Sequence, residues 1–97
     1  MKYGVALTPT AEENLDQIYR FIAVRNLPAA QKFVAGIRTA ITTLGRHPRR
    51  CPLAPEDGLD GMELRHLIHG NYRIIFVVAS ERVTILQIRH AARLPMD

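Results

Sequence analysis

The fold is decided by one stretch, MELRHLIHGNYRIIFVVASERVTILQIRH, which runs from Met62 to His90. It contains three apolar runs, Met62–Ile68, Tyr72–Ala79 and Val83–Arg89, and only three residues separate each run from the next. Connections this short impose antiparallel pairing, so the stretch predicts a three-stranded meander. The middle run is apolar on both faces apart from Arg73, which predicts a central strand with helices covering one side.

Two amphipathic helices are predicted upstream of the meander. Apolar residues recur at helical spacing from Ala11 to Ile22 and again from Ala30 to Leu44. Two caps would begin the first helix equally well: Thr8 followed by proline, or Thr10 with a glutamate three residues later. The tripeptide Asn26–Pro28 ends this helix and begins the next, so the two helices form an antiparallel hairpin.

The remaining segments complete the predicted order β-α-α-β-β-β. Tyr3–Leu7 alternates as a short strand, which we expect at an edge of the sheet, and Arg46–Gly61 has the prolines and glycines of a loop. A small antiparallel sheet packed on a helical hairpin is a two-layer α+β fold. Ninety-seven residues and 10.9 kDa predict a single domain, 1–97.

Composition narrows the class of protein. Hydrophobic residues make up 47% and charged residues 23%, which is typical of folded soluble chains. The longest apolar run, Ile74–Ala79, is far short of the about 20 residues of a membrane-spanning helix. The N-terminus lacks a secretory pattern, and the single Cys51 cannot form an internal disulfide. We therefore expect a cytoplasmic protein with a reduced thiol and no membrane partner.

The charge balance indicates the kind of partner. Thirteen basic residues face nine acidic ones, for a net charge of +4, and eleven of the thirteen are arginine. The guanidinium fork suits carboxylates and phosphates held in a fixed orientation, so we expect an acidic protein or a nucleic acid as partner. The alternative is a modest positive excess that only keeps the surface soluble.

No metal or cofactor is predicted, because the histidines lack ligand spacing and no glycine-rich phosphate loop precedes a helix. The remaining candidates are arginines and histidines. Arg46 and His47 are expected to complement the dipole of the preceding helix, whereas Arg49 and Arg50 lie beyond its reach. Arg65 lies mid-strand on a face that we expect to be exposed, where it either pairs with a neighbouring glutamate or faces a ligand.

The end of the last strand holds a further group of candidates. If the hairpins bring Arg65 near Arg93, that face would hold a phosphodiester and His90 could move protons during attack by a ribose hydroxyl. The alternative is a basic terminus that serves solubility or partner docking. The candidate residues for binding a partner are Arg49, Arg50, Arg65, Arg73, Arg89, His90 and Arg93, and those for catalysis are Arg65, His90 and Arg93.

Several short sequence motifs occur in a specific order along nearly the whole chain. They are Leu7–Leu15, Phe33–Leu44 followed by His47-Pro48-Arg49, Glu63–Arg65, Gly70–Phe76 and Ile85–Arg93. In this order the chain resembles the RelE/ParE superfamily of toxins from bacterial type II toxin–antitoxin operons. The resemblance implies the fold above and a cytoplasmic toxin, associated with growth arrest and plasmid stabilisation. It also implies a cognate antitoxin, with an acidic and partly disordered tail, that holds the toxin inactive in a hetero-oligomer.

The superfamily divides by target. RelE-like members cleave mRNA on the ribosome with basic residues of the sheet, and Arg65 and Arg93 match such positions. In this resemblance Arg49 or Arg50 would take the place of the loop lysines, and His90 that of the base near the C-terminus. ParE-like members inhibit DNA gyrase without catalysis, and the His90–Arg93 ending resembles theirs. The chain ends at Asp97, without the aromatic C-terminal helix of RelE-like nucleases, which favours the gyrase branch. A third reading is a non-toxic, antitoxin-binding co-repressor.

Overall fold

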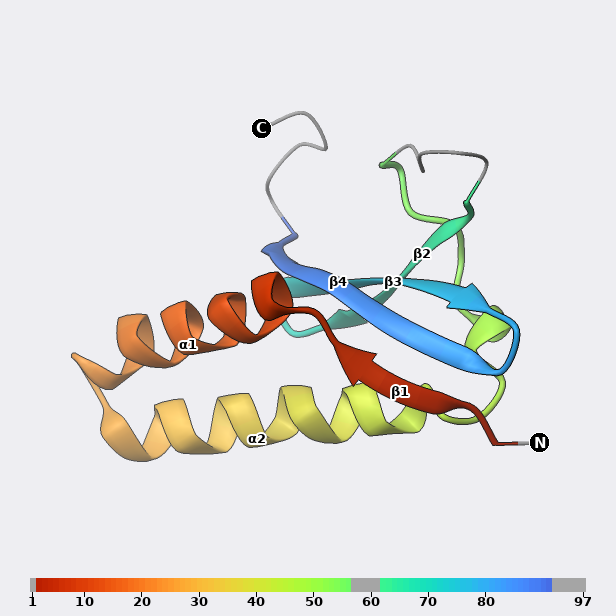
Figure 1. The fold of residues 1–97 in the computed structure, drawn as a ribbon. Helices are drawn as coiled ribbons and strands as arrows, with labels where there is room; N and C mark the ends of the chain where they lie inside the picture. The colour runs from red at the N-terminus through yellow and green to blue at the C-terminus, as the bar shows by residue number, and fades with distance from the viewer. Residues whose placement is uncertain (1, 57–61, 92–97) are drawn as a thin grey trace.

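The computed structural model describes residues 2–56 and 62–91. Its elements in chain order are β1 (Gly4–Leu7), α1 (Pro9–Ala23), α2 (Leu27–Thr43), a short 3₁₀ helix η1 (Pro48–Arg50), β2 (Leu64–His69), β3 (Tyr72–Ala79) and β4 (Arg82–His90) (Figure 1). The predicted order β-α-α-β-β-β is confirmed. In its described part, residues 46–56, the expected loop after α2 contains η1 and two isolated β-bridges, Lys2 with Arg46 and Leu53 with Arg65.

The four strands form one sheet in the order β1-β4-β3-β2. The meander of β2, β3 and β4 is antiparallel, and β3 lies inside the sheet, as predicted. Strand β2 forms one edge of the sheet and β1 the other. β1 runs parallel to β4, from Gly4 opposite Arg82 to Leu7 opposite Ile85. The sheet is therefore mixed, and the prediction of a purely antiparallel sheet was wrong for β1. Only a tight turn forces antiparallel pairing, and none joins β1 to β4.

The helical hairpin covers one face of this sheet (Figure 1). Leu15 of α1 and Ile37 of α2 meet Phe76 and Ile85 of the central strands, and each of these side chains is at most 1% exposed. Burial of one such side chain stabilises the fold by about 1.5–3 kcal/mol. The opposite side of the sheet is called the far face below. Within residues 2–56 and 62–91 we find no helix long and apolar enough to cross a membrane.

A β-bulge keeps both ends of β4 in register with this core. Ile75 pairs with Gln87 but Phe76 pairs with Ile85, so Leu86 is an extra residue in β4. Ile85 and Ile88 are three residues apart and would otherwise point to opposite faces. The bulge lets both side chains face the helices, where Ile85 is 0% and Ile88 is 5% exposed.

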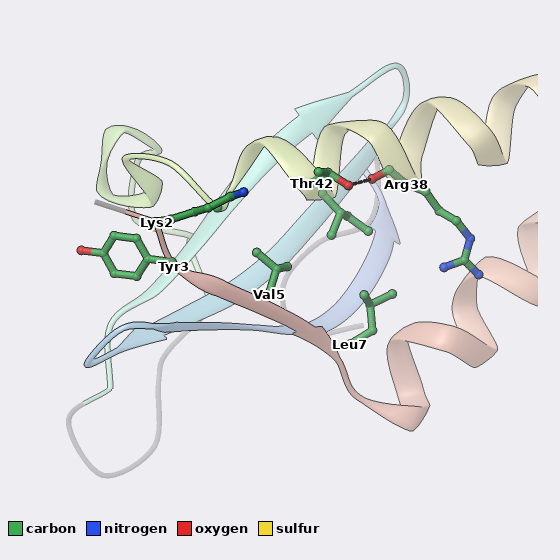
Figure 2. Close-up of a pocket in the computed structure, with 8 residues that line it drawn as sticks. Lys2, Tyr3, Val5, Leu7, Arg38 and Thr42 are labelled. Atoms are coloured by element: carbon green, nitrogen blue, oxygen red, sulfur yellow. Dashed lines mark hydrogen bonds between the residues drawn. The ribbon is translucent and has the colours of Figure 1, made fainter.

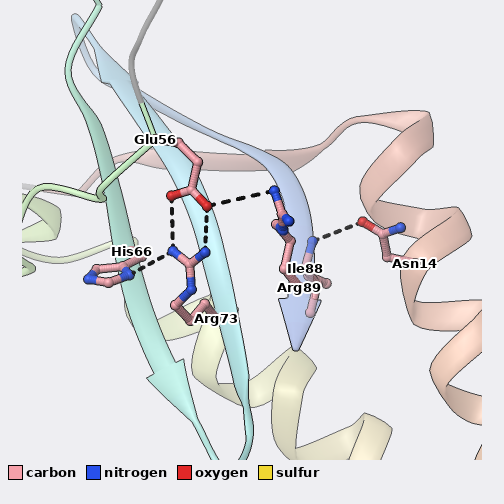
Figure 3. Close-up of polar contacts among 6 residues, drawn as sticks. All are labelled: Asn14, Glu56, His66, Arg73, Ile88 and Arg89. Atoms are coloured by element: carbon pink, nitrogen blue, oxygen red, sulfur yellow. Dashed lines mark hydrogen bonds and ion pairs between the residues drawn. The ribbon is translucent and has the colours of Figure 1, made fainter. Parts of the chain in front are cut away.

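Helix α1 bonds the backbone of β4 around the bulge. The Thr8 hydroxyl donates to the carbonyl of Leu86 at 2.9 Å, and the Asn14 side-chain oxygen accepts from the amide of Ile88 at 2.9 Å (Figure 3). The Thr8 oxygen also accepts from the amide of Ala11 at 3.1 Å, so Thr8 is the cap used. Thr8 thus begins the helix and attaches it to the sheet.

Candidate functional site

A polar cluster lies on the far face of the sheet. Antiparallel pairing places Arg73 of β3 opposite Arg89 of β4, and His66 of β2 lies opposite Ile75 on the same face. Glu56, from the loop after η1, reaches over these strands (Figure 3). We call Glu56, His66, Arg73 and Arg89 the far-face cluster.

Glu56 binds both arginines of the cluster. Arg73 Nη1 donates to Glu56 Oε1 at 3.0 Å, and Arg73 Nη2 donates to Glu56 Oε2. Arg89 Nη1 lies 3.8 Å from the same Oε2. The side chains are 6% exposed at Arg73, 12% at Arg89 and 10% at Glu56. This is a shielded, bidentate ion pair, the geometry in which a guanidinium binds a carboxylate best.

These contacts set the charge states of the cluster. The hydrogen bonds from Arg73 lower the pKa of Glu56, and the same bonds raise the pKa of Arg73. Burial, together with the nearby charge of Arg73, lowers the pKa of His66. His66 Nδ1 lies 3.2 Å from Arg73 Nη1, and because a guanidinium only donates, Nδ1 accepts. The proton of the neutral His66 ring is therefore on Nε2.

The sequence reasoning named Arg73 and Arg89 but missed their partners. A neutral imidazole beside a guanidinium can act as a base next to a bound phosphate, but here its lone pair at Nδ1 already accepts from Arg73. In this structure the Glu56 carboxylate occupies both Nη atoms of Arg73. A signal for Glu56 was present in the sequence, because residues 17–55 contain no acidic residue and Glu56 is the first one after them.

Arg65 lies on the other side of the sheet. It pairs with Phe76, so its side chain shares the helix-facing side with the core, and the expected exposed face was wrong. Arg65 Nη1 donates to the carbonyl of Cys51 at 2.7 Å, and Nη2 lies 3.4 Å from Glu63 Oε1. Of the two alternatives for Arg65, the glutamate pair is the one observed. Burial raises the pKa of the Cys51 thiol, which favours the unreactive thiol form.

His90 belongs to an aromatic group at the far end of β3 from Arg65. Its ring meets Tyr72 edge-on at 5.2 Å, and Tyr72 lies 5.7 Å from Phe33 of α2. His90 pairs with Tyr72, and Arg65 pairs with Phe76. Tyr72 and Phe76 are four residues apart in β3, which corresponds to about 13 Å along a strand. The structure therefore does not bring Arg65 and His90 together. Arg93 lies outside the described residues.

Arg49 and Arg50 lie where α2 ends. Arg50 Nη1 donates to the carbonyls of Arg46 at 2.7 Å and His47 at 3.2 Å, and Nη2 donates to the Thr43 hydroxyl at 3.0 Å. Arg50 thus reaches back to Thr43, the last residue of α2, so the prediction that Arg50 lies beyond the reach of the helix end was wrong. The reason is the left-handed backbone of His47, with φ of 48°, which turns η1 back onto the helix. Arg49 Nη1 donates to the Tyr3 hydroxyl at 3.1 Å.

A groove of about 380 Å³ separates β1 from α2 (Figure 2). It is lined by Lys2, Tyr3, Val5, Leu7, Arg38, Ile41, Thr42 and Gly45. The amides of Gly4 and Thr8 bond to carbonyls next to or within β4, so by strand alternation the backbone groups of Val5 and Leu7 point away from the sheet. Among the described residues, the groove therefore combines the unpaired outer edge of β1 with an apolar floor. Lys2 lies at one end and Arg38, whose Nη2 is 3.0 Å from Glu12 Oε1, at the other.

The sequence of this chain matches a known protein family. Residues 5–95 match the family model described as the ParE toxin of the type II toxin–antitoxin system, parDE. The chain belongs to the ParE toxin family. It is thus a toxin of a type II toxin–antitoxin system, and the resemblance to the RelE/ParE superfamily is confirmed. A search of curated proteins found no matching sequence.

Solved structures share the fold of this ParE-family toxin. The chromosomal ParDE system from P. aeruginosa superposes with a TM-score of 0.73 at 23% identity, over 92% of this chain and 96% of that one. The archaeal RelE–RelB complex from Pyrococcus horikoshii OT3 gives 0.65 at 16% identity, over 97% and 100%. The RelBE2 toxin–antitoxin complex from Mycobacterium tuberculosis gives 0.56 at 26% identity, over 93% and 99%.

Proposed function

We propose that this ParE-family toxin inhibits DNA gyrase, without catalysis of its own, until a cognate antitoxin neutralises it. The observation that carries the proposal is the far-face cluster. A nuclease needs cationic donors that are open to the scissile phosphate, and here Glu56 binds Arg73 through both carboxylate oxygens. An inhibitor that acts by binding does not need such donors.

The groove between β1 and α2 supports the antitoxin half of the proposal. An extended segment can add to the edge of β1 and place alternate side chains over Val5 and Leu7. Acidic side chains on that segment would meet Lys2 at one end of the groove, and at the other end they would compete with Glu12 for Arg38. An acidic antitoxin tail that folds on binding has these properties. The three similar structures above come from toxin–antitoxin systems, which supports an antitoxin partner here.

The gyrase assay uses purified toxin with gyrase and relaxed plasmid. The expected result is loss of supercoiling with accumulation of cleaved DNA, and recovery when the antitoxin encoded beside the toxin is added first. Induced cells should arrest growth and switch on the DNA damage response. Full supercoiling activity at a large molar excess of toxin would refute the gyrase target.

Binding-residue variants test where the target contact lies. His90 is exposed at the end of β4, and we propose that His90 and Arg93 contact the target. His90→Ala and Arg93→Ala should weaken growth arrest while thermal melts show that both variants remain folded. Arg25→Ala, at the tip of the helical hairpin, is the control and should remain fully toxic. Full toxicity of folded His90→Ala and Arg93→Ala proteins would place the contact elsewhere.

A ribosome-dependent endoribonuclease is the second candidate. It is favoured by neutral His66 beside Arg73, because a base next to a cation suits attack by a ribose hydroxyl once a bound substrate draws Arg73 away from Nδ1. Primer extension on mRNA from induced cells separates the two: cuts within minutes, lost in His66→Gln, would establish the nuclease. The absence of any growth arrest would instead favour the non-toxic co-repressor.

A further inference from the structure

Positive charge gathers where α2 ends. Residues 17–55 contain seven lysines and arginines and no acidic residue, and the chain start adds Lys2. Lys2 pairs through its backbone with Arg46, and the Tyr3 amide donates to the carbonyl of Gly45 at 2.7 Å, so the start of β1 lies beside the end of α2 (Figures 1 and 2). We call the residues that meet there the cationic end: Lys2, Arg46, His47, Arg49 and Arg50.

Within residues 2–56 and 62–91, the cationic end takes part in no ion pair. The ion pairs of the described residues use other arginines, namely Arg20, Arg38, Arg65, Arg73 and Arg89. All five residues of the cationic end are exposed, and Tyr3, Pro48 and three of them line a hollow of about 520 Å³. Like charges held together repel each other, so an anionic partner at this place would gain binding energy.

The geometry favours a partner of high charge density. Nη1 of Arg50 is bonded to backbone carbonyls and Nη2 to the Thr43 hydroxyl, so its planar fork is not open for bidentate binding of a carboxylate. Its positive charge remains, held at a fixed position. Arg49 is held by one bond, from Nη1 to the Tyr3 hydroxyl. Charges held in place along a surface suit a row of phosphates better than an acidic peptide, because phosphate binding draws on charge and counterion release.

We propose that the cationic end binds the phosphate backbone of duplex DNA. The choice of DNA over RNA rests on the proposed gyrase function, because a toxin seated on gyrase lies beside the duplex that the enzyme holds. Binding at this surface is independent of base sequence, since the residues offer charge to phosphates and none is set to read base edges. Lys2 lies where this surface borders the groove between β1 and α2, and the rest of the groove is left for the antitoxin.

Salt dependence gives the proposal a magnitude. If the four lysine and arginine side chains each neutralise one phosphate, the logarithm of the affinity falls with a slope of about −3.6 against the logarithm of salt concentration. Raising the salt from about 50 to about 200 mM then weakens binding about 150-fold. Removing two of the four charges reduces the same loss to about 12-fold.

The experiment measures fluorescence anisotropy of a labelled duplex of about 20 base pairs with the purified toxin at both salt concentrations. The variant is Arg46→Gln with Arg49→Gln, and neither residue lines the groove. The control is Arg25→Gln with Lys32→Gln, which removes the same charge near the other end of α2. Thermal melts of all three proteins establish that each one is folded.

We expect the Arg46/Arg49 variant to lose affinity and about half of the salt slope, while the control keeps the slope of the wild type. Equal losses in the two variants, or no binding to duplex at the lower salt, would overturn the proposal. So would tighter binding of single-stranded RNA of equal length. Gyrase inhibition is measured separately: DNA binding without inhibition refutes only the proposed function, and inhibition without DNA binding refutes only this surface.

Discussion

Replacing Glu56 with glutamine tests the far-face cluster most directly. The substitution keeps the shape of the side chain and removes its charge, which leaves Arg73 and Arg89 close together and 6% and 12% exposed. Breaking a buried ion pair by removing one partner costs about 3–5 kcal/mol. The glutamine oxygen still accepts one hydrogen bond, so we expect the lower end, about 3 kcal/mol.

The assay is thermal unfolding at pH 7 followed by circular dichroism. For a domain of this size, 1 kcal/mol corresponds to about 4–8 °C in melting temperature, so Glu56→Gln should melt about 12–24 °C lower than the wild type. The matched control is Glu63→Gln, whose carboxylate is 67% exposed and lies 3.4 Å from Arg65. An exposed pair contributes at most about 1 kcal/mol, so the control should shift by a few degrees.

A double variant separates charge from shape. Glu56→Leu with Arg73→Met removes both members of the bidentate pair and keeps Arg89. Replacing both partners of a buried pair by apolar groups is often close to neutral, and one arginine no longer repels another. We therefore expect the double variant to be more stable than Glu56→Gln alone. Equal melting temperatures for Glu56→Gln and Glu63→Gln would refute the reasoning that Glu56 neutralises buried charge. A double variant less stable than Glu56→Gln would refute it too.

Three further outcomes follow from the same contacts. Thr8→Ala should destabilise the fold by about 1 kcal/mol or more through the lost cap, whereas Thr10→Ala should cost less than about 0.5 kcal/mol, and urea titrations compare the two. Arg65→Ala leaves the carbonyl of Cys51 without its 2.7 Å partner, so we expect a loss of about 1–3 kcal/mol and faster amide hydrogen exchange in η1. The lowered pKa of His66 means that the unfolded chain takes up a proton first as the pH falls below the usual value of 6.5. The stability of the wild type should therefore decline below that pH, and protonation of Glu56 should cause a further loss at lower pH. The variant His66→Gln should lack the first decline, which melts at pH 7, 6 and 5 would show.

The elements of this fold were predictable from the sequence because each depends on neighbours in the chain. Apolar spacing defined both helices, Asn26 marked the break between them, and short turns defined the antiparallel meander of β2, β3 and β4. Turn chemistry and side-chain periodicity act over a few residues, so one sequence contains them. The family resemblance drew on the same local motifs, and the match over residues 5–95 bears it out.

Contacts between distant residues decided the rest. The parallel direction of β1 and the bulge at Leu86 depend on how helices and sheet pack, and no local pattern encodes either of them. Glu56 meets Arg73 across 17 residues, and Arg65 turns to the helix-facing side because its strand pairs with Phe76. The sequence by itself determined which side chains carry charge. Only the tertiary structure decided which of those charges neutralise one another, because that depends on distances that chain folding alone creates.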